Sequence, residues 1–109
     1  MQVLTNTDHS VGNYQGLSAY AQGVVETALR HFSEHITRVE VHLSDEHGAN
    51  HGPDDKRCVM EARVVGRPPL AATHHAVTND AAIHGAAMAL AKLIDGAFGR
   101  AARPREAHG

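Results

Sequence analysis

The segment Ile36–Gly66, ITRVEVHLSDEHGANHGPDDKRCVMEARVVG, decides the fold, because it contains two alternating strands joined by a polar loop. Apolar Val39, Val41 and Leu43 alternate with polar or charged neighbours, which is the period of a strand with one buried face. The same alternation returns in Cys58–Val64. The segment therefore predicts a hairpin with one apolar face and one face rich in arginine, glutamate and histidine.

Four further elements are predicted around this hairpin. A first strand is expected at Met1–Val3, a helix around Leu17–His35 that Ile36–Thr37 closes, a further strand at about Leu70–His75, and a second helix around Asp80–Phe98. The order is therefore strand, helix, three strands, helix.

Both helices are predicted to bury one face, because their apolar residues recur at three- and four-residue steps. The first stripe is Leu17, Tyr20, Val24, Ala28 and Phe32, widened by Ala21, Val25 and Leu29. The opposite face has Glu26, Arg30 and Glu34 at the spacing of i,i+4 ion pairs. The second stripe is Ile83, Ala87, Leu90, Ile94 and Ala97 or Phe98, with Thr78 or Asn79 as the N-cap.

Two apolar helix faces need one apolar sheet face, so we expect an α+β two-layer sandwich with both helices on one side of a four-stranded mixed sheet. A right-handed crossover pairs strands one and two in parallel, and the remaining strands form an antiparallel meander. Double-stranded RNA-binding domains have a similar layout. The other sheet face would then carry Glu40, His42, Arg57, Glu61 and Arg63.

Length and composition indicate one globular domain, since the chain has 109 residues, of which 42% are hydrophobic and 20% charged. We expect a domain over residues 1–99 and a flexible tail over residues 100–109. The longest uninterrupted apolar run, Ala86–Ala91, is far shorter than the roughly 20 residues of a membrane span, so no transmembrane helix and no signal segment are predicted. The single cysteine, Cys58, suits a core position in a reducing cytosol.

No Ser-His-Asp, Cys-His or phosphate-loop pattern is present, so we expect neither enzymatic activity nor a cofactor. The net charge of −2 is unevenly distributed along the chain. Residues 1–55 carry two basic and eight acidic side chains, which gives −6, and residues 56–105 carry eight basic and three acidic ones, which gives +5. This segregation is compatible with a basic patch that binds RNA, or with chance.

Ten histidines raise two hypotheses. His31 and His35, and separately His47 and His51 in the acidic loop, are weak metal candidates, but neither pair has defined third and fourth ligands, so no metal site is predicted. Alternatively, full protonation would change the net charge from −2 to +8 and could make RNA affinity acid-dependent. Histidines that merely occupy surface positions are the plain alternative to both.

The hairpin, together with the first strand and both helices, resembles the ribosome hibernation-promoting factors, bacterial proteins that bind the small ribosomal subunit and silence translation. The resemblance covers nearly the whole chain, and its most specific part is Ala81–Gly85 followed by Leu90–Ile94. An acidic residue is usual in the family at the place of His84, and several basic residues are usual where Ala89 and Gly96–Phe98 stand here. The chain resembles the short family members, which lack a C-terminal dimerisation domain.

The resemblance implies a cytoplasmic protein that occupies the mRNA and tRNA channel of the small subunit near the decoding sites under stress, without performing chemistry. Its partners would be the small subunit and its rRNA, with no membrane and no small-molecule substrate. Few aromatic side chains are available for base stacking, so backbone and shape recognition of folded RNA is expected. The residues expected to contact RNA are Arg30, Arg38, Lys56, Arg57, Arg63, Arg67, Lys92 and Arg100.

The rival hypothesis is a divergent member that kept the fold and lost ribosome binding. Such a protein would act as a protein-interaction module or a histidine-based metal-binding module. The base-poor second helix favours this alternative.

Overall fold

The computed structural model describes residues 1–8, 11–46 and 55–102, the last three of them as backbone only. The elements are β1 (Gln2–Thr7), α1 (Tyr14–Ala28), the 3₁₀ helix η1 (Arg30–His35), β2 (Ile36–Asp45), β3 (Lys56–Val64), β4 (Leu70–Ala76) and α2 (Asn79–Ala102).

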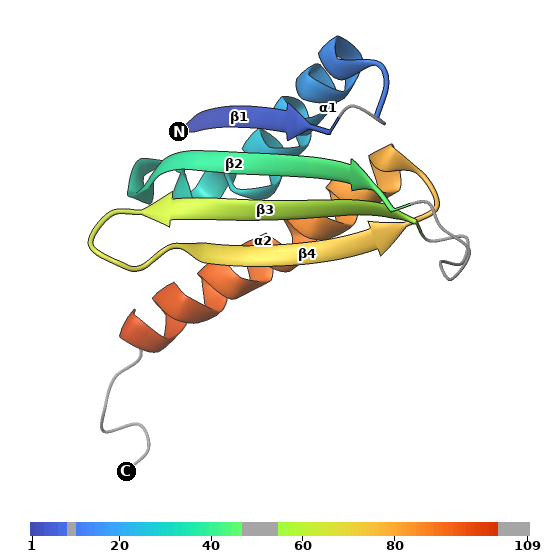
Figure 1. The fold of residues 1–109 in the computed structure, drawn as a ribbon. Helices are drawn as coiled ribbons and strands as arrows, with labels where there is room; N and C mark the ends of the chain where they lie inside the picture. Colours follow the sequence, from blue (N-terminus) through green and yellow to red (C-terminus); the bar gives the residue numbers. More distant parts are fainter. Residues whose placement is uncertain (9–10, 47–54, 103–109) are drawn as a thin grey trace.

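The four strands form one mixed sheet in the order β1-β2-β3-β4. β1 runs parallel to β2, from Gln2 opposite Arg38 to Thr7 opposite Leu43. β2, β3 and β4 form an antiparallel meander. Both helices lie behind the sheet in the view of Figure 1. The predicted α+β two-layer sandwich is therefore confirmed.

The core lies between the helices and the inner face of the sheet, which is the face directed towards them. Alternate residues are buried there over Val39–Leu43 of β2 and Cys58–Val64 of β3, as the alternation predicted, and α1 and α2 supply the opposing apolar side chains. The residues with no exposed surface include Val25, Leu29, Val39, Val41, Cys58, Met60, Ile83, Leu90 and Ile94. This single core excludes water from one sheet face and leaves the other face in solvent.

The first helix is shorter than predicted. α1 ends at Ala28, and the chain continues as η1 before Ile36, which belongs to β2 and does not close a helix. Residues three apart are eclipsed in a 3₁₀ helix, and η1 accordingly directs Phe32 and His35 to the same Phe98 ring, at centroid distances of 5.5 and 5.2 Å.

This shortening also changes the predicted faces of the helix. Buried positions of α1 and the residue after it are Leu17, Ala21, Val25 and Leu29, whereas Tyr20 is 38% exposed. The stripe predicted through Tyr20 is therefore the edge of the buried face and not its centre. Arg30 and Glu34 lie in η1, where the α-helical i,i+4 spacing no longer places them on one face.

The second helix is longer than predicted and starts as predicted. The Thr78 hydroxyl oxygen accepts the Ala81 backbone N–H at 3.1 Å, which identifies Thr78 as the N-cap. At the other end, α2 continues to Ala102, past the expected start of the tail at residue 100. Residues 103–109 lie outside the described part of the chain.

Helix α2 corrects one expectation from the sequence. Its segment Asn79–Gly99 is long and apolar enough to span a membrane by length and composition, because alanines raise its mean hydropathy despite Lys92 and Asp95. One stripe of the helix, which includes Ile83 and Leu90, is fully buried against the sheet. We therefore interpret α2 as the core helix of this domain.

Candidate nucleic-acid interface

The outer face of the sheet, which points away from both helices, collects the charged side chains of the strands. The five residues predicted for this face alternate with the buried positions of β2 and β3 and so lie on it. Glu46 follows β2 directly and extends the hairpin, because its N–H donates to the Asp55 carbonyl oxygen at 2.7 Å. The charged and titratable residues described on this face are Arg38, Glu40, His42, Glu46, Arg57, Glu61, Arg63 and His75.

In two successive cross-strand pairs on this face, side chains of like charge lie opposite each other. Arg38 lies directly opposite Arg63, and Glu40 lies opposite Glu61. Each arginine instead pairs along its own strand, with 2.9 Å between Arg38 Nη2 and Glu40 Oε2 and 3.7 Å between Arg63 Nη2 and Glu61 Oε1. Like charges directly opposite each other are unfavourable in a sheet. Arginines are, however, suited to bind phosphate, because the planar guanidinium group offers parallel N–H donors.

A second charged cluster lies at the other end of the same face. Glu46 is shared by Arg57, at 3.9 Å from Oε2 to Nε, and His75, at 3.2 Å from Oε1 to Nε2. Arg57 and His75 are cross-strand partners on β3 and β4. Three of the predicted RNA-binding residues, Arg38, Arg57 and Arg63, thus lie on the outer face, with Arg57 at the end opposite to Arg38 and Arg63.

Lys56 is not part of this group, since it alternates with Arg57 and belongs to the inner side at the end of the hairpin. Its Nζ lies 2.8 Å from Asp55 Oδ1 and 3.3 Å from Asp45 Oδ2. The hydrogen bond to Asp55 is the main cause that raises the pKa of Lys56 above 10.5, and Asp45 contributes in the same direction. Its ammonium group therefore contacts two carboxylates already.

Arg67 is likewise engaged within the fold. Its guanidinium carbon lies 4.5 Å from the centre of the Phe98 ring, and Nη1 donates to the Ala97 carbonyl oxygen at 3.3 Å. These contacts join the turn between β3 and β4 to α2. Of the remaining predicted residues, Arg30 is exposed in η1, Lys92 is exposed on α2, and the side chain of Arg100 lies outside the described part of the chain.

The histidines do not assemble a metal centre in the described part of the chain, where no group of three or more His, Cys, Asp or Glu side chains could hold an ion. Residues four apart in a 3₁₀ helix differ by roughly 120° in direction, so η1 does not provide the clamp expected of His31 and His35. His47 and His51 lie outside the described residues. Cys58 is a buried core residue, and burial raises the pKa of its thiol to about 12.

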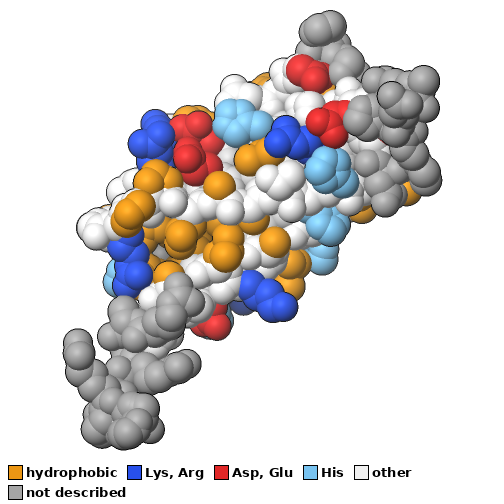
Figure 2. All heavy atoms as spheres, turned by 60° about the horizontal axis from the view of Figure 1, so that its bottom comes forward, with side chains coloured by type: hydrophobic (Ala, Val, Ile, Leu, Met, Phe, Trp, Pro, Cys, Tyr) orange, Lys and Arg blue, Asp and Glu red, His pale blue; other side chains and the backbone are white. Residues whose placement is uncertain are grey.

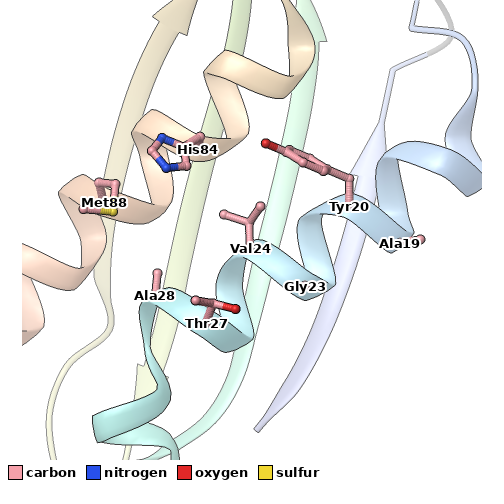
Figure 3. A pocket seen from close by; sticks show the side chains of 8 residues that line it. All are labelled: Ala19, Tyr20, Gly23, Val24, Thr27, Ala28, His84 and Met88. Atoms are coloured by element: carbon pink, nitrogen blue, oxygen red, sulfur yellow. The ribbon is translucent and has the colours of Figure 1, made fainter.

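An apolar groove of about 550 Å³ lies on the helix side of the molecule, opposite the outer face. Figure 3 shows Tyr20 and Val24 of α1 facing His84 and Met88 of α2 across it. Met88 is 52% exposed. The groove explains why the predicted stripe through Tyr20 and Val24 is only partly covered.

Charge is scattered on the surface that Figure 2 presents. Lys and Arg side chains stand apart there, separated by acidic, histidine and hydrophobic side chains. The sequence predicted which residues share the outer face but missed that Glu46 joins Arg57 to His75. The alternation of the strands was the available signal for His75, whereas the position of Glu46 depends on the closure of the hairpin by Asp55.

No family model and no curated protein matches this sequence. Solved structures do match the fold. The N-terminal domain of Protein Y from Thermus thermophilus is similar with a TM-score of 0.69 and 14% identity, over 88% of this chain and 98% of that domain. A ribosomal subunit interface protein from Coxiella burnetii is similar with a TM-score of 0.64 and 11% identity, over 90% and 98% of the two chains. The resemblance inferred from the sequence is therefore confirmed at the level of the fold.

Proposed function

We propose that this chain is a cytoplasmic ribosome-associated protein that inhibits translation under stress. It would bind the small ribosomal subunit and its rRNA near the decoding sites and block the entry of mRNA and tRNA by steric exclusion. A shared fold with a protein described as a ribosomal subunit interface protein supports the association. No cofactor or small-molecule substrate is needed for this mechanism.

The observation that carries the proposal is the cross-strand pair Arg38 and Arg63 on the open sheet face. We assign the main phosphate contacts to these two residues and to Arg57 on the same face. Exposed Arg30 and Lys92 would add contacts from η1 and α2, as would Arg100. Lys56 and Arg67 would contribute least, because their cationic groups already have partners within the fold.

Co-sedimentation with small ribosomal subunits, stepped from low to physiological salt, tests the proposal. Arg57→Gln/Arg63→Gln should weaken binding and reduce the salt slope by about 0.7–0.9 log units for each lost phosphate contact. Gln15→Glu/Gln22→Glu, on exposed positions of α1, changes the net charge equally and should leave the slope intact. Absence of subunit binding at low salt, or equal effects of the two variants, would contradict the proposal.

A second candidate function, a protein-interaction module, is favoured by the apolar groove between α1 and α2. The same assay separates the two. Binding that is insensitive to salt, unaffected by Arg57→Gln/Arg63→Gln and lost in Met88→Glu would assign the contact to the groove and not to the arginines.

A further inference from the structure

Two carboxylates on the outer face are each shared between an arginine and a histidine. Glu40 contacts Arg38 at 2.9 Å through Oε2 and His42 Nε2 at 3.5 Å through Oε1. Glu46 contacts Arg57 at 3.9 Å through Oε2 and His75 Nε2 at 3.2 Å through Oε1. The same arrangement thus occurs twice on one surface, with one carboxylate oxygen directed to the arginine and the other to the imidazole.

The charge of this face depends on the two histidines. Its described arginines, Arg38, Arg57 and Arg63, are balanced by the glutamates Glu40, Glu46 and Glu61, so the face is neutral while both histidines are neutral. Protonation of His42 and His75 would give it a net charge of +2. Histidine is the side chain whose charge ordinarily changes between pH 5 and 8.

Few other charged groups face these histidines. On β2, His42 lies beside Glu40, and its cross-strand neighbours are uncharged Asn6 of β1 and Val59 of β3. The positions on either side of Val59 place Arg57 and Glu61 diagonally from His42. His75, on the edge strand β4, has Arg57 opposite it on β3 and Glu46 beside it. Among the described residues, a glutamate is therefore the nearest charged partner of each ring.

We propose that the outer face is an acid-dependent binding surface for the phosphate backbone of RNA, which becomes available when His42 and His75 are protonated. Each charged imidazole then neutralises its glutamate, and the arginine that shared that glutamate is free to bind a phosphate. This proposal rests on the proposed function and specifies when the same surface binds. It also reconciles the RNA-binding hypothesis with the scattered charge of the surface at neutral pH.

The salt dependence of binding gives the sharpest measure. Two additional phosphate contacts should make the slope of log K against log salt steeper by about 1.4–1.8 at pH 6 than at pH 8. Affinity should rise as the pH falls, because the bound state takes up protons. We suggest measuring dissociation constants of the full chain for small ribosomal subunits and for a short RNA duplex of random sequence, at both pH values across a salt series.

His42→Gln/His75→Gln should bind with the same slope at both pH values. The matched control His31→Gln/His35→Gln removes two exposed histidines outside the outer face and should keep the dependence of the native protein. Glu40→Gln/Glu46→Gln should bind RNA more tightly than the native protein at pH 8, because both arginines are free there. The substituted histidines and glutamates of the outer face are on the solvent side of the sheet, so these variants should fold. Circular dichroism would verify that each variant is folded.

A slope that is equal at both pH values, or a pH dependence that survives in His42→Gln/His75→Gln, would overturn the acid-dependent surface and leave the proposed function in place. Failure to bind subunits, combined with duplex binding that responds to pH through His42 and His75, would overturn the proposed function and support the surface. Absence of binding at pH 6 to both the subunits and the RNA duplex would overturn the proposed function and the acid-dependent surface.

Discussion

The two faces of the sheet differ in the cross-strand neighbours that their side chains have. On the inner face, Val39, Val41 and Leu43 are buried opposite Ala62, Met60 and Cys58, and local pattern and global fold agree. On the outer face, Arg38 opposes Arg63 and Glu40 opposes Glu61. Local conflict in an otherwise consistent fold is expected at functional surfaces. We therefore expect the inner face to determine stability, and substitutions on the outer face to have little effect on it.

The largest contrast in stability should appear between two leucines. Leu43→Ala removes a 2%-exposed core side chain and should reduce the free energy of unfolding by about 2–5 kcal/mol. Leu4→Ala removes a 37%-exposed side chain of the outer face and should cost less than roughly 1 kcal/mol. Urea unfolding of both variants measures the difference. Equal losses would show that the outer face is also part of the core.

The thiol of Cys58 reports on the inner face directly. With a pKa of about 12, it carries roughly a thousandfold less thiolate at pH 8 than a free cysteine, so native protein should react with a thiol reagent correspondingly slowly. Unfolded protein should react at the ordinary rate. Fast labelling under native conditions would contradict the burial.

The same pKa predicts a loss of stability in alkali. The unfolded state ionises Cys58 above its ordinary pKa, whereas the folded state holds the proton until about pH 12, so the free energy of unfolding falls as the pH rises through this window. Comparing the pH dependence of the native protein with that of Cys58→Ala isolates this contribution. Parallel curves would contradict it.

A smaller effect is expected where α2 meets β4. A Cβ on Gly85 would clash with the His74 imidazole, so the ring must move if any side chain is introduced. Gly85→Ala in the background of His74→Ala should therefore gain about 1 kcal/mol from helix propensity, and Gly85→Ala alone should gain less. Thermal unfolding of the native protein, the two single variants and the double variant gives the coupling energy between residues 74 and 85. Equal gains in both backgrounds would show that the ring does not restrict residue 85.

The smallest effect should come from the outer-face ion pairs. Arg63→Gln and Glu61→Gln should each change the free energy of unfolding by no more than about 1 kcal/mol, because the pair is solvent-exposed and 3.7 Å apart. The two losses should be similar, since each substitution also relieves repulsion in a like-charge pair, Glu61 with Glu40 and Arg63 with Arg38. Denaturant titration measures both. A loss comparable to that of Leu43→Ala would mean that this face determines stability as well.

Local pattern predicted the strands and much of the inner face. Alternation identified the buried sides of β2 and β3, and Thr78 was recognisable as a cap because a polar residue precedes the periodic apolar stripe. The end of α1 was not predictable in this way. Phe32 and His35 continue the pattern of the helix in sequence, and their contacts in η1 are with the distant Phe98, which local pattern does not reveal.

The candidate site was predictable residue by residue but not as an arrangement. Alternation placed Arg57 and Arg63 on the outer face. It could not show that Arg38 would face Arg63, because that register depends on the irregularity between Ile36 and Arg38 and on the closure of the hairpin. Nor could it show that Lys56, adjacent to Arg57 in sequence, would be held by two carboxylates.

The parallel pairing of β1 with β2 has a consequence for synthesis. Of the four strands of this sheet, β1 leaves the ribosomal exit tunnel before the others, yet its partner β2 follows only after α1 and η1. The meander of β2, β3 and β4 consists of neighbours in sequence and closes smaller loops, which form faster. We therefore expect the nascent chain to fold from its middle, with the N-terminal strand docking after the hairpin has formed.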